Sequence, residues 1–452
     1  MKHLLLFLCA FTLTTLSAQK EDGDQKFAPA QLKEDLAYIK HLLFEVQANP
    51  FSEISKPAYE QLFSGIETRL NDSLTATEFF KLVRPCTAFL SDEHARIGLS
   101  KPSKSYRSGY IFLPLSLKKV GKNYVLDTIL MDDTGLIKDD IITHINKIPV
   151  EQIVQQCADY TSGFPEQRME KAAKQLGYLY AMTTPAQESF IVTRNGNEDI
   201  KMPGAQFKTW LSFLSDQGHD DCSDLIRYTK IGETGYIDAC SFGVRSDSAM
   251  EAVRQKIDGI FNQIQNDKVK NLIIDVSQNS GGNSGVGDII LDYITSKPYF
   301  GYQCNWRRSK EYLKQMDSWG SKDERYTQTK VGEILHYAPS EHKPGDNNRR
   351  FYQKVYVVVG QGTFSSAIMF ATMVKDNHIA TLVGQTPTNG HPNHFGELYS
   401  ANTPNTGLNI QFGVKEWIRP AGKQGQNLLV PDVLLNDQDM SSAERMAKAL
   451  VK

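Results

Sequence analysis

The sequence contains little of what a protein built around disulfides or metal ions needs. Only 6 of its 452 residues are cysteine. Cys9 lies in the N-terminal apolar run, and the others are spread widely, at Cys86, Cys157, Cys222, Cys240 and Cys304. Disulfide scaffolds carry cysteines densely and in even number, so we do not expect this class of fold. The sequence also has no C-x-x-C pair, no H-E-x-x-H motif and no His-rich tract, so no metal site is predicted.

The chain has almost no net charge. It carries 50 basic and 52 acidic side chains, a formal charge of -2. Such a balance provides no long-range field to attract nucleic acid or a strongly acidic ligand. Nucleic-acid binding is therefore not expected.

Long apolar runs are absent after the first residues of the sequence. The run Leu4–Leu16 follows the basic Lys2 and ends in the small residues Ser17 and Ala18. This order predicts a secretory signal peptide over residues 1–18, cleaved after Ala18. A membrane anchor is the alternative, although the run is shorter than the ~20 residues that span a bilayer. We expect an exported protein, periplasmic or extracellular, with no stable membrane insertion after the signal peptide is removed.

A chain of this length, 40% hydrophobic, exceeds one compact core, so we expect about two to four domains. Residues 19–99 are predicted to form a helical N-terminal domain. Apolar side chains recur there at three- and four-residue steps, at Leu32, Leu36, Ile39, Leu43 and Val46. Thr75 and Glu78 have the spacing of a capping box at the start of a later helix.

Residues 105–205 have a β-rich pattern. Two short β runs, 111–117 and 124–130, predict a hairpin. Residues 135–149 then resemble the latter half of a PDZ domain, a module that binds extended peptide ends at a sheet edge. Lys138 replaces the usual glycine before the acidic residue. Peptide binding and a merely structural role both remain open for this PDZ-like module.

Residues 231–452 alternate strand and helix patterns, as an α/β layer fold does. An amphipathic helix is expected at 248–264, and buried strands are expected at 236–242, 271–276, 355–359 and 381–383. A charged insertion at roughly 300–350 interrupts this alternation. We interpret the insertion as a lid or wall over the site.

The segment around Ser365 has the strongest chemical signature. A buried strand leads through a glycine-containing turn to Thr363–Ala367 and then into a helix. Ser365 falls at the first turn of that helix, where unpaired amides and the positive end of the helix dipole favour an oxyanion. The alternative is that Ser365 or Ser366 is only a helix N-cap.

A second buried strand is followed by a pair of glycines. Residues 273–283 read Ile-Ile-Asp-Val-Ser-Gln-Asn-Ser-Gly-Gly-Asn, with Gly281 and Gly282 in the turn. Adjacent glycines let backbone N–H groups approach a ligand closely. We expect these amides and that of Ser366 to form an oxyanion hole beside Ser365.

Together the two segments resemble the C-terminal-processing, or tail-specific, serine proteases and the related tricorn-core and chlamydial secreted proteases. The shared pattern is Asp-x-x-x-Asn-x-Gly-Gly after a strand, Thr-x-Ser-x-Ala before a helix, then Val383-Gly384 and Thr388-Asn389-Gly390. The resemblance covers residues 30–452 approximately. It implies a crotonase/ClpP-like α/β catalytic core, acyl chemistry on Ser365, peptide or protein substrates and no cofactor.

The general base can be one of two histidines. Tail-specific members have a catalytic lysine after Thr-x-Gly, but His391 stands there in this chain. A serine still needs a proton acceptor with a pKa near neutrality, and histidine meets that need. His94, in Asp92-Glu93-His94, resembles the catalytic histidine that the tricorn-like and chlamydial branches place in an Asp-x-His turn. We therefore favour His94 over His391.

The acid that orients the base remains open. Those branches place a glutamate shortly before Gly-Val-x-Pro-Asp, but residues 424–432 contain none. Glu397 and Asp92 are the candidate substitutes, because a carboxylate is the usual partner of a catalytic histidine. The sequence favours an exported serine endopeptidase. The alternative is a catalytically inactive protein of the same fold that binds a peptide or an apolar ligand.

The signal peptide gives a direct prediction. N-terminal sequencing of the exported protein should begin near Gln19, because the small residues Ser17 and Ala18 form the cleavage site. An intact Met1 on protein purified from a periplasmic or secreted fraction would contradict it.

Overall fold

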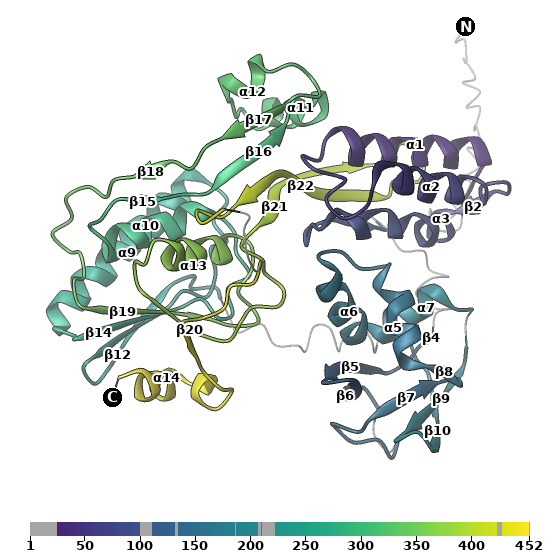
Figure 1. Ribbon diagram of the computed structural model, residues 1–452, viewed down its shortest axis with the longest axis horizontal. Coiled ribbons are helices and arrows are strands. Elements are labelled where there is room, and N and C mark those ends of the chain that lie inside the picture. Colours follow the sequence, from purple (N-terminus) through teal and green to yellow (C-terminus); the bar gives the residue numbers. More distant parts are fainter. Residues whose placement is uncertain are drawn as a thin grey trace, which may run out of the picture.

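The computed structural model describes residues 25–99, 111–131, 134–185, 187–206, 209, 222–422 and 427–451. The predicted signal peptide lies outside these residues. The described chain has a mixed α/β structure whose N-terminal, middle and C-terminal parts follow one another along the sequence (Figure 1). Within the described residues, no helix is long and apolar enough to cross a membrane.

The N-terminal part is mainly helical. Thr75 and Glu78 form the expected capping box: the Thr75 hydroxyl accepts from the Glu78 amide at 3.2 Å, and the Glu78 carboxylate accepts from the Thr75 amide at 2.8 Å. A 3-10 segment follows because Pro85 cannot continue the preceding helix. The elements are β1 (Lys26–Phe27), α1 (Pro29–Glu45), α2 (Lys56–Glu67), β2 (Leu74–Thr75), α3 (Ala76–Val83), η2 (Arg84–Leu90) and β3 (Arg96–Gly98).

In its described residues, the middle part combines short antiparallel strands with the helices α5, α6 and α7. The predicted hairpin forms between β5 and β6, but its first run is divided, because residues 111–112 pair separately with β11. A four-stranded sheet has the order β10-β9-β7-β8. The elements are β4 (Ile111–Phe112), β5 (Leu115–Val120), β6 (Asn123–Ile129), β7 (Ile142–Ile145), β8 (Ile148–Pro149), α5 (Val150–Ala158), α6 (Pro165–Lys174), α7 (Leu176–Thr183), β9 (Ser189–Arg194), β10 (Glu198–Pro203) and β11 (Ala205–Gln206).

The C-terminal part is built on a six-stranded sheet of order β12-β13-β14-β19-β20-β23, parallel except for β12. Its central strands β14, β19 and β20 are near-continuous apolar runs, as expected of strands covered on both faces. Helices α9 (Asp247–Asp267), α10 (Ser284–Ile294) and α13 (Ser366–Asp376) pack on one face, and α14 (Ala443–Leu450) packs on the other. The strands are β12 (Arg227–Ile231), β13 (Thr234–Asp238), β14 (Asn271–Asp275), β19 (Lys354–Val359), β20 (Thr381–Gly384) and β23 (Val433–Leu434).

A second sheet joins the C-terminal part to the N-terminal helices. Its order is β17-β16-β22-β21, and β3 from the N-terminal part also pairs with β22. Figure 1 shows the β21–β22 hairpin reaching across to α1 and α2. The remaining elements are β15 (Tyr299–Phe300), β16 (Gln303–Arg307), α11 (Lys310–Ser318), α12 (Glu324–Gln328), β17 (Ile334–Tyr337), β18 (Glu341–His342), β21 (His394–Asn402), β22 (Asn409–Ile418) and η3 (Asp439–Ser441).

The insertion at 300–350 differs from the lid or wall that the sequence predicts. Trp306 is 4% exposed and lies in one hydrophobic cluster with the N-terminal helices and the β21–β22 hairpin. Its ring stacks on Tyr326 with centroids 4.0 Å apart. The charged residues of the insertion gave a surface-like pattern, but its aromatic residues build a core. The insertion therefore packs against the β21–β22 hairpin and stabilises it.

A buried carboxylate fastens that hairpin to the first helix. Asp35 of α1 is fully buried, and its two oxygens accept from the amides of Asn405 at 2.9 Å and Thr406 at 2.8 Å. These amides belong to the turn between β21 and β22, where no strand partner could satisfy them. Charge-assisted bonds of this kind are the stronger ones. The contact fixes the N-terminal helices relative to the hairpin.

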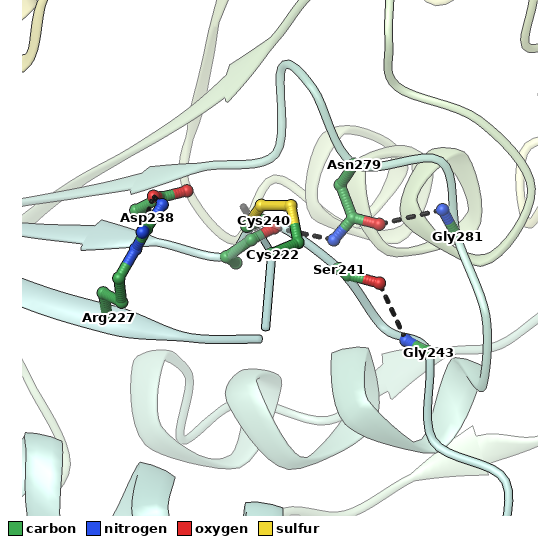
Figure 2. The surroundings of a disulfide bond; sticks show 9 residues. Cys222, Arg227, Asp238, Cys240, Ser241, Gly243, Asn279 and Gly281 are labelled. Atoms are coloured by element: carbon green, nitrogen blue, oxygen red, sulfur yellow. Dashed lines mark hydrogen bonds and ion pairs between the residues drawn. A yellow bond between two sulfur atoms is a disulfide. The ribbon is translucent and has the colours of Figure 1, made fainter. Parts of the chain in front are cut away.

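One disulfide joins Cys222 to Cys240 among the described cysteines, while Cys86, Cys157 and Cys304 are free and buried. The sequence did not predict this pair, because nothing in the spacing shows that the chain before β12 returns to the end of β13. Figure 2 shows the disulfide close to Asn279. The Asn279 amide donates to the Ala239 carbonyl at 2.7 Å, next to Cys240.

Candidate active site

Ser365 lies at the point where β19 passes into α13. The preceding turn is tied by buried Thr363, whose hydroxyl donates to the Val276 carbonyl at 2.8 Å and accepts from the Gly360 amide at 3.0 Å. The Phe364 amide donates to the Asn279 carbonyl at 3.0 Å. Ser365 itself has φ 51° and ψ -123°, a conformation that costs a non-glycine residue roughly 1–3 kcal/mol. The surrounding hydrogen bonds hold this strained turn, which presents the serine side chain at the start of the helix.

The glycine pair packs directly against this turn. A Cβ atom on Gly281 would lie 2.7 Å from Ser365 Cβ and 2.9 Å from the Ser366 nitrogen, so the position requires glycine. The Ser366 hydroxyl donates to the Gly282 carbonyl at 2.8 Å and fastens the helix start to the glycine turn. Gly281, Gly282, Ser365 and Ser366 are thus brought together, although about 80 residues separate the two segments in the sequence.

The amides of the predicted oxyanion hole are not equivalent. The Gly281 N–H donates to the Asn279 side-chain oxygen at 2.8 Å and is therefore already occupied, contrary to expectation (Figure 2). In the described residues, the Gly282 and Ser366 amides have no hydrogen-bond acceptor. Asn279 thus sets the shape of the turn, and of the three amides those of Gly282 and Ser366 remain free to donate.

His94 reaches Ser365 from the N-terminal part of the chain. Its Nε2 lies 3.2 Å from the Ser365 hydroxyl oxygen, and its ring packs on Phe364 with centroids 4.8 Å apart. The side chain is only 10% exposed. A separation of 3.2 Å is within reach for proton transfer between a serine and a histidine.

Asp92 is the carboxylate that lies beside His94. Its Oδ1 accepts from the His94 amide at 2.8 Å and is 3.4 Å from His94 Nδ1, while its Oδ2 accepts from the Gly413 amide at 2.6 Å. Burial works to lower the pKa of His94, but the Asp92 carboxylate beside the ring, with the charge of Glu93, outweighs it and raises the pKa. The imidazolium form is therefore stabilised in place.

Glu397, the other candidate acid, has different partners. It lines the cavity in front of Ser365, but its carboxylate accepts from the Tyr312 hydroxyl at 3.1 Å and from Lys415 at 3.2 Å. The contact with His94 comes from Asp92 instead. The sequence could not separate the two, because the answer depends on where β22 places Gly413 relative to the Asp92 turn.

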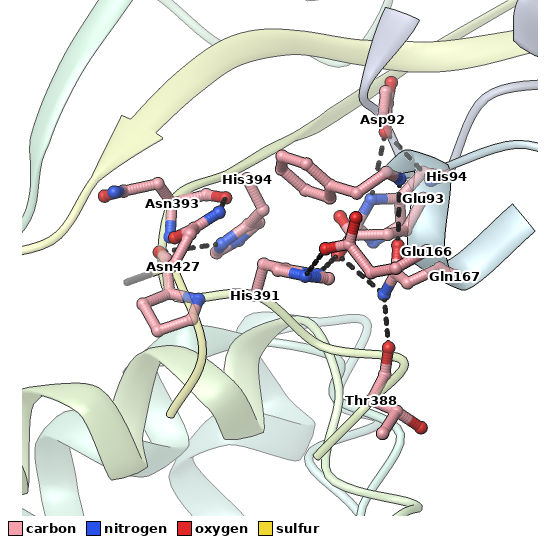
Figure 3. Close-up of polar contacts among 12 residues, drawn as sticks. Asp92, Glu93, His94, Glu166, Gln167, Thr388, His391, Asn393, His394 and Asn427 are labelled. Carbon is pink, nitrogen blue, oxygen red and sulfur yellow. Dashed lines mark hydrogen bonds and ion pairs between the residues drawn. The ribbon is translucent and has the colours of Figure 1, made fainter. Parts of the chain in front are cut away.

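His391 is brought to the back of the His94 turn rather than to Ser365. It is 1% exposed, its Nδ1 is 2.8 Å from a Glu93 oxygen, and it does not line the cavity (Figure 3). His394, which sequence reasoning missed, does line the cavity, with its ring centroid 6.5 Å from that of His94. Burial lowers the pKa of His394. No motif surrounds His394, so the sequence carried no signal for it.

The cavity beside Ser365 has a volume of about 530 Å³. Apolar side chains from four different segments contribute to its wall, namely Val244, Met369, Leu398 and Trp417. None of its lining residues comes from 300–350. Another cavity, of about 420 Å³, lies among α9, α10 and residues 345–350 and holds none of the predicted site residues. In the part of the chain that the structure describes, no cluster of three or more His, Cys, Asp or Glu side chains could hold a metal ion.

Comparison with known proteins shows what this arrangement is similar to. Residues 233–435 match the model of peptidase family S41, and no curated protein matches the sequence. Among solved structures, mature CPAF is similar with TM-score 0.61 and 12% identity, over 93% of this chain and 95% of that one. CPAF complexed with lactacystin gives TM-score 0.59 and 13% identity, over 93% and 97%. At this identity the likeness shows a shared fold, and the family match supplies the class. Residues 233–435 therefore match peptidase family S41, and the protein is a serine-type peptidase that shares the fold of mature CPAF.

Proposed function

We propose that the protein is an exported serine endopeptidase that cleaves peptides or proteins through an acyl-enzyme on Ser365. The observation that carries this proposal is the 3.2 Å separation between His94 Nε2 and the Ser365 hydroxyl, at the wall of a cavity of about 530 Å³. The residue roles follow from the contacts around that pair.

The first half of the reaction forms the acyl-enzyme. His94 takes the hydroxyl proton as Ser365 attacks the scissile carbonyl carbon, and the carbonyl oxygen becomes an oxyanion. The Gly282 and Ser366 amides hold that oxyanion. Asp92 stabilises the imidazolium, which then gives its proton to the leaving amine as the peptide bond breaks. Water, with His94 again as base, hydrolyses the ester and restores Ser365.

An inactive, ligand-binding protein of this fold is the alternative function. Such a protein would have no need of a strained Ser365 at φ 51° with a buried histidine in contact. Strain of this kind persists where the surrounding structure maintains it and is concentrated at functional sites. These features favour the enzyme.

Export and the identity of the middle part belong to the same proposal. The apolar run Leu4–Leu16 supports export to the periplasm or medium. The sheet order of the C-terminal part is consistent with a crotonase/ClpP-like catalytic core in residues 231–452, and the strands and helices of residues 105–205 are consistent with a PDZ-like module.

The PDZ-like module would bind an extended peptide at an edge of its four-stranded sheet. The two edge strands of that sheet are β8 and β10. With Ser365→Ala protein, a substrate peptide carrying a photo-crosslinker should attach to β8 or β10. Attachment confined to the walls of the Ser365 cavity would leave the module with a structural role alone.

Removing the proposed nucleophile or base should abolish turnover. Ser365→Ala and His94→Ala are each expected to lower kcat by roughly 10⁴- to 10⁶-fold. Nucleophile and base act as one unit, so the loss of either removes most of the catalytic effect of both. The measurement is steady-state hydrolysis of extended peptides, with exposed Ser248→Ala as the matched control. Wild-type turnover by His94→Ala would disprove its role as base.

The pH dependence should report the charge of Asp92. His94 must be neutral to accept a proton, and its raised pKa places the acid limb of kcat/KM above the usual range for histidine. Asp92→Asn removes the charge that raises this pKa, so the limb should move to lower pH while kcat falls roughly 10²- to 10⁴-fold. A profile unchanged in Asp92→Asn would show that Asp92 does not act on His94.

A further inference from the structure

A buried contact between Glu93 and His391 lies directly behind the His94 turn. Glu93, between Asp92 and His94 in sequence, points its side chain toward His391 (Figure 3). The Glu93 oxygen is 2.8 Å from His391 Nδ1, and both side chains are 1% exposed. The same turn is thus held on one side through Asp92 and on the other through Glu93.

Helix α6 of the middle part, with the residue before it, encloses this contact. Its Gln167 side chain donates to the Thr388 carbonyl at 2.7 Å and lies 3.4 Å from the Glu93 oxygen that His391 contacts. Glu166 lies 3.3 Å from His391 Nε2. The ring of Phe164 covers the imidazole, with centroids 4.1 Å apart. His391 therefore has little freedom to move, and Ser365 is not among its contacts.

Glu93 depends on these partners because its second oxygen, Oε2, is buried and has no hydrogen-bond partner among the described residues. A buried carboxylate that loses its partner must move toward water or change its charge state. Either change would act on the peptide unit next to His94. Misplacing a catalytic group by about 1 Å can cost on the order of 10²-fold in rate.

We propose that His391 is a positioning residue that acts through Glu93 to hold His94 against Ser365. The inference rests on the proposed role of His94 as base. In this chain, His391 occupies the position where tail-specific proteases carry their lysine. It supports the histidine base through Glu93 instead of contacting Ser365. The reaction itself passes through Ser365 and His94 only.

Single substitutions should separate the positioning role from a base. His391→Ala should lower kcat by about 10- to 100-fold with KM within about twofold, well short of the loss in His94→Ala. His391→Asn should recover most of this rate, because its side-chain amide occupies the place of Nδ1 and can donate to Glu93. Exposed His336→Ala is the matched control and should leave kcat unchanged.

A double substitution tests the route through Glu93. If His391 acts through that carboxylate, His391→Ala combined with Glu93→Gln should be no slower than His391→Ala alone, within about twofold. Glu93→Gln should also shift the acid limb of kcat/KM to lower pH, because the charge of Glu93 is one cause of the raised pKa of His94. The charged or titratable groups around His94 and Glu93 are Asp92, His394, His391 and Lys171, and Glu166 contacts the far nitrogen of His391.

Several outcomes would overturn the inference. A lower Tm in His391→Ala with wild-type kcat and pH profile would show a merely structural role. Loss of turnover in His391→Ala with turnover kept in His94→Ala would make His391 the base. If His391→Ala does not fold, Glu93→Gln provides the test. An unchanged kcat and an unchanged acid limb of kcat/KM in Glu93→Gln would then overturn the inference. A wild-type protein that cleaves no peptide would overturn the proposed function as well, whereas wild-type rates in His391→Ala overturn this inference alone.

Discussion

The contact between His94 and Ser365 is the interaction on which the rest of the structure depends. The two residues are 271 positions apart, and their side chains meet at 3.2 Å. Ser365 is fixed by the sheet of the C-terminal part and the turn at Thr363, whereas His94 leaves a helical region that belongs to the other end of the chain. An error of 1 Å in how these two parts pack would be large for proton transfer. The architecture can therefore be understood as a means of keeping that distance.

Three sets of buried polar contacts maintain the packing. Asp35 ties the first helix to the turn of the β21–β22 hairpin. Asp92 ties the His94 turn to β22 through the Gly413 amide. Glu93 ties the same turn to His391 and to helix α6. Each is a carboxylate that accepts donors distant in sequence, so each is costly to break and specifies one arrangement of the parts.

The sequence predicted the local features of the site well. The strand, glycine turn and helix around Ser365 follow from apolar periodicity and from residues whose local conformations are restricted. Long-range geometry was not predictable. The preference for Asp92 over Glu397, the occupied amide of Gly281 and the core position of Trp306 all depend on which segments meet in space. Periodicity and motif spacing carry no information about such long-range contacts. The exception is His94, which the Asp-x-His turn, a specific pattern, singled out.

Covalent labelling with a fluorophosphonate probe tests the central claim most directly, because the probe reacts only with a serine that is activated by a base and faces an oxyanion site. After digestion, mass spectrometry of the labelled wild-type protein should place the adduct on Ser365. Labelling should be absent in Ser365→Ala and greatly slowed in His94→Ala. A folded wild-type protein that takes up no probe, or an adduct on another serine, would contradict the account.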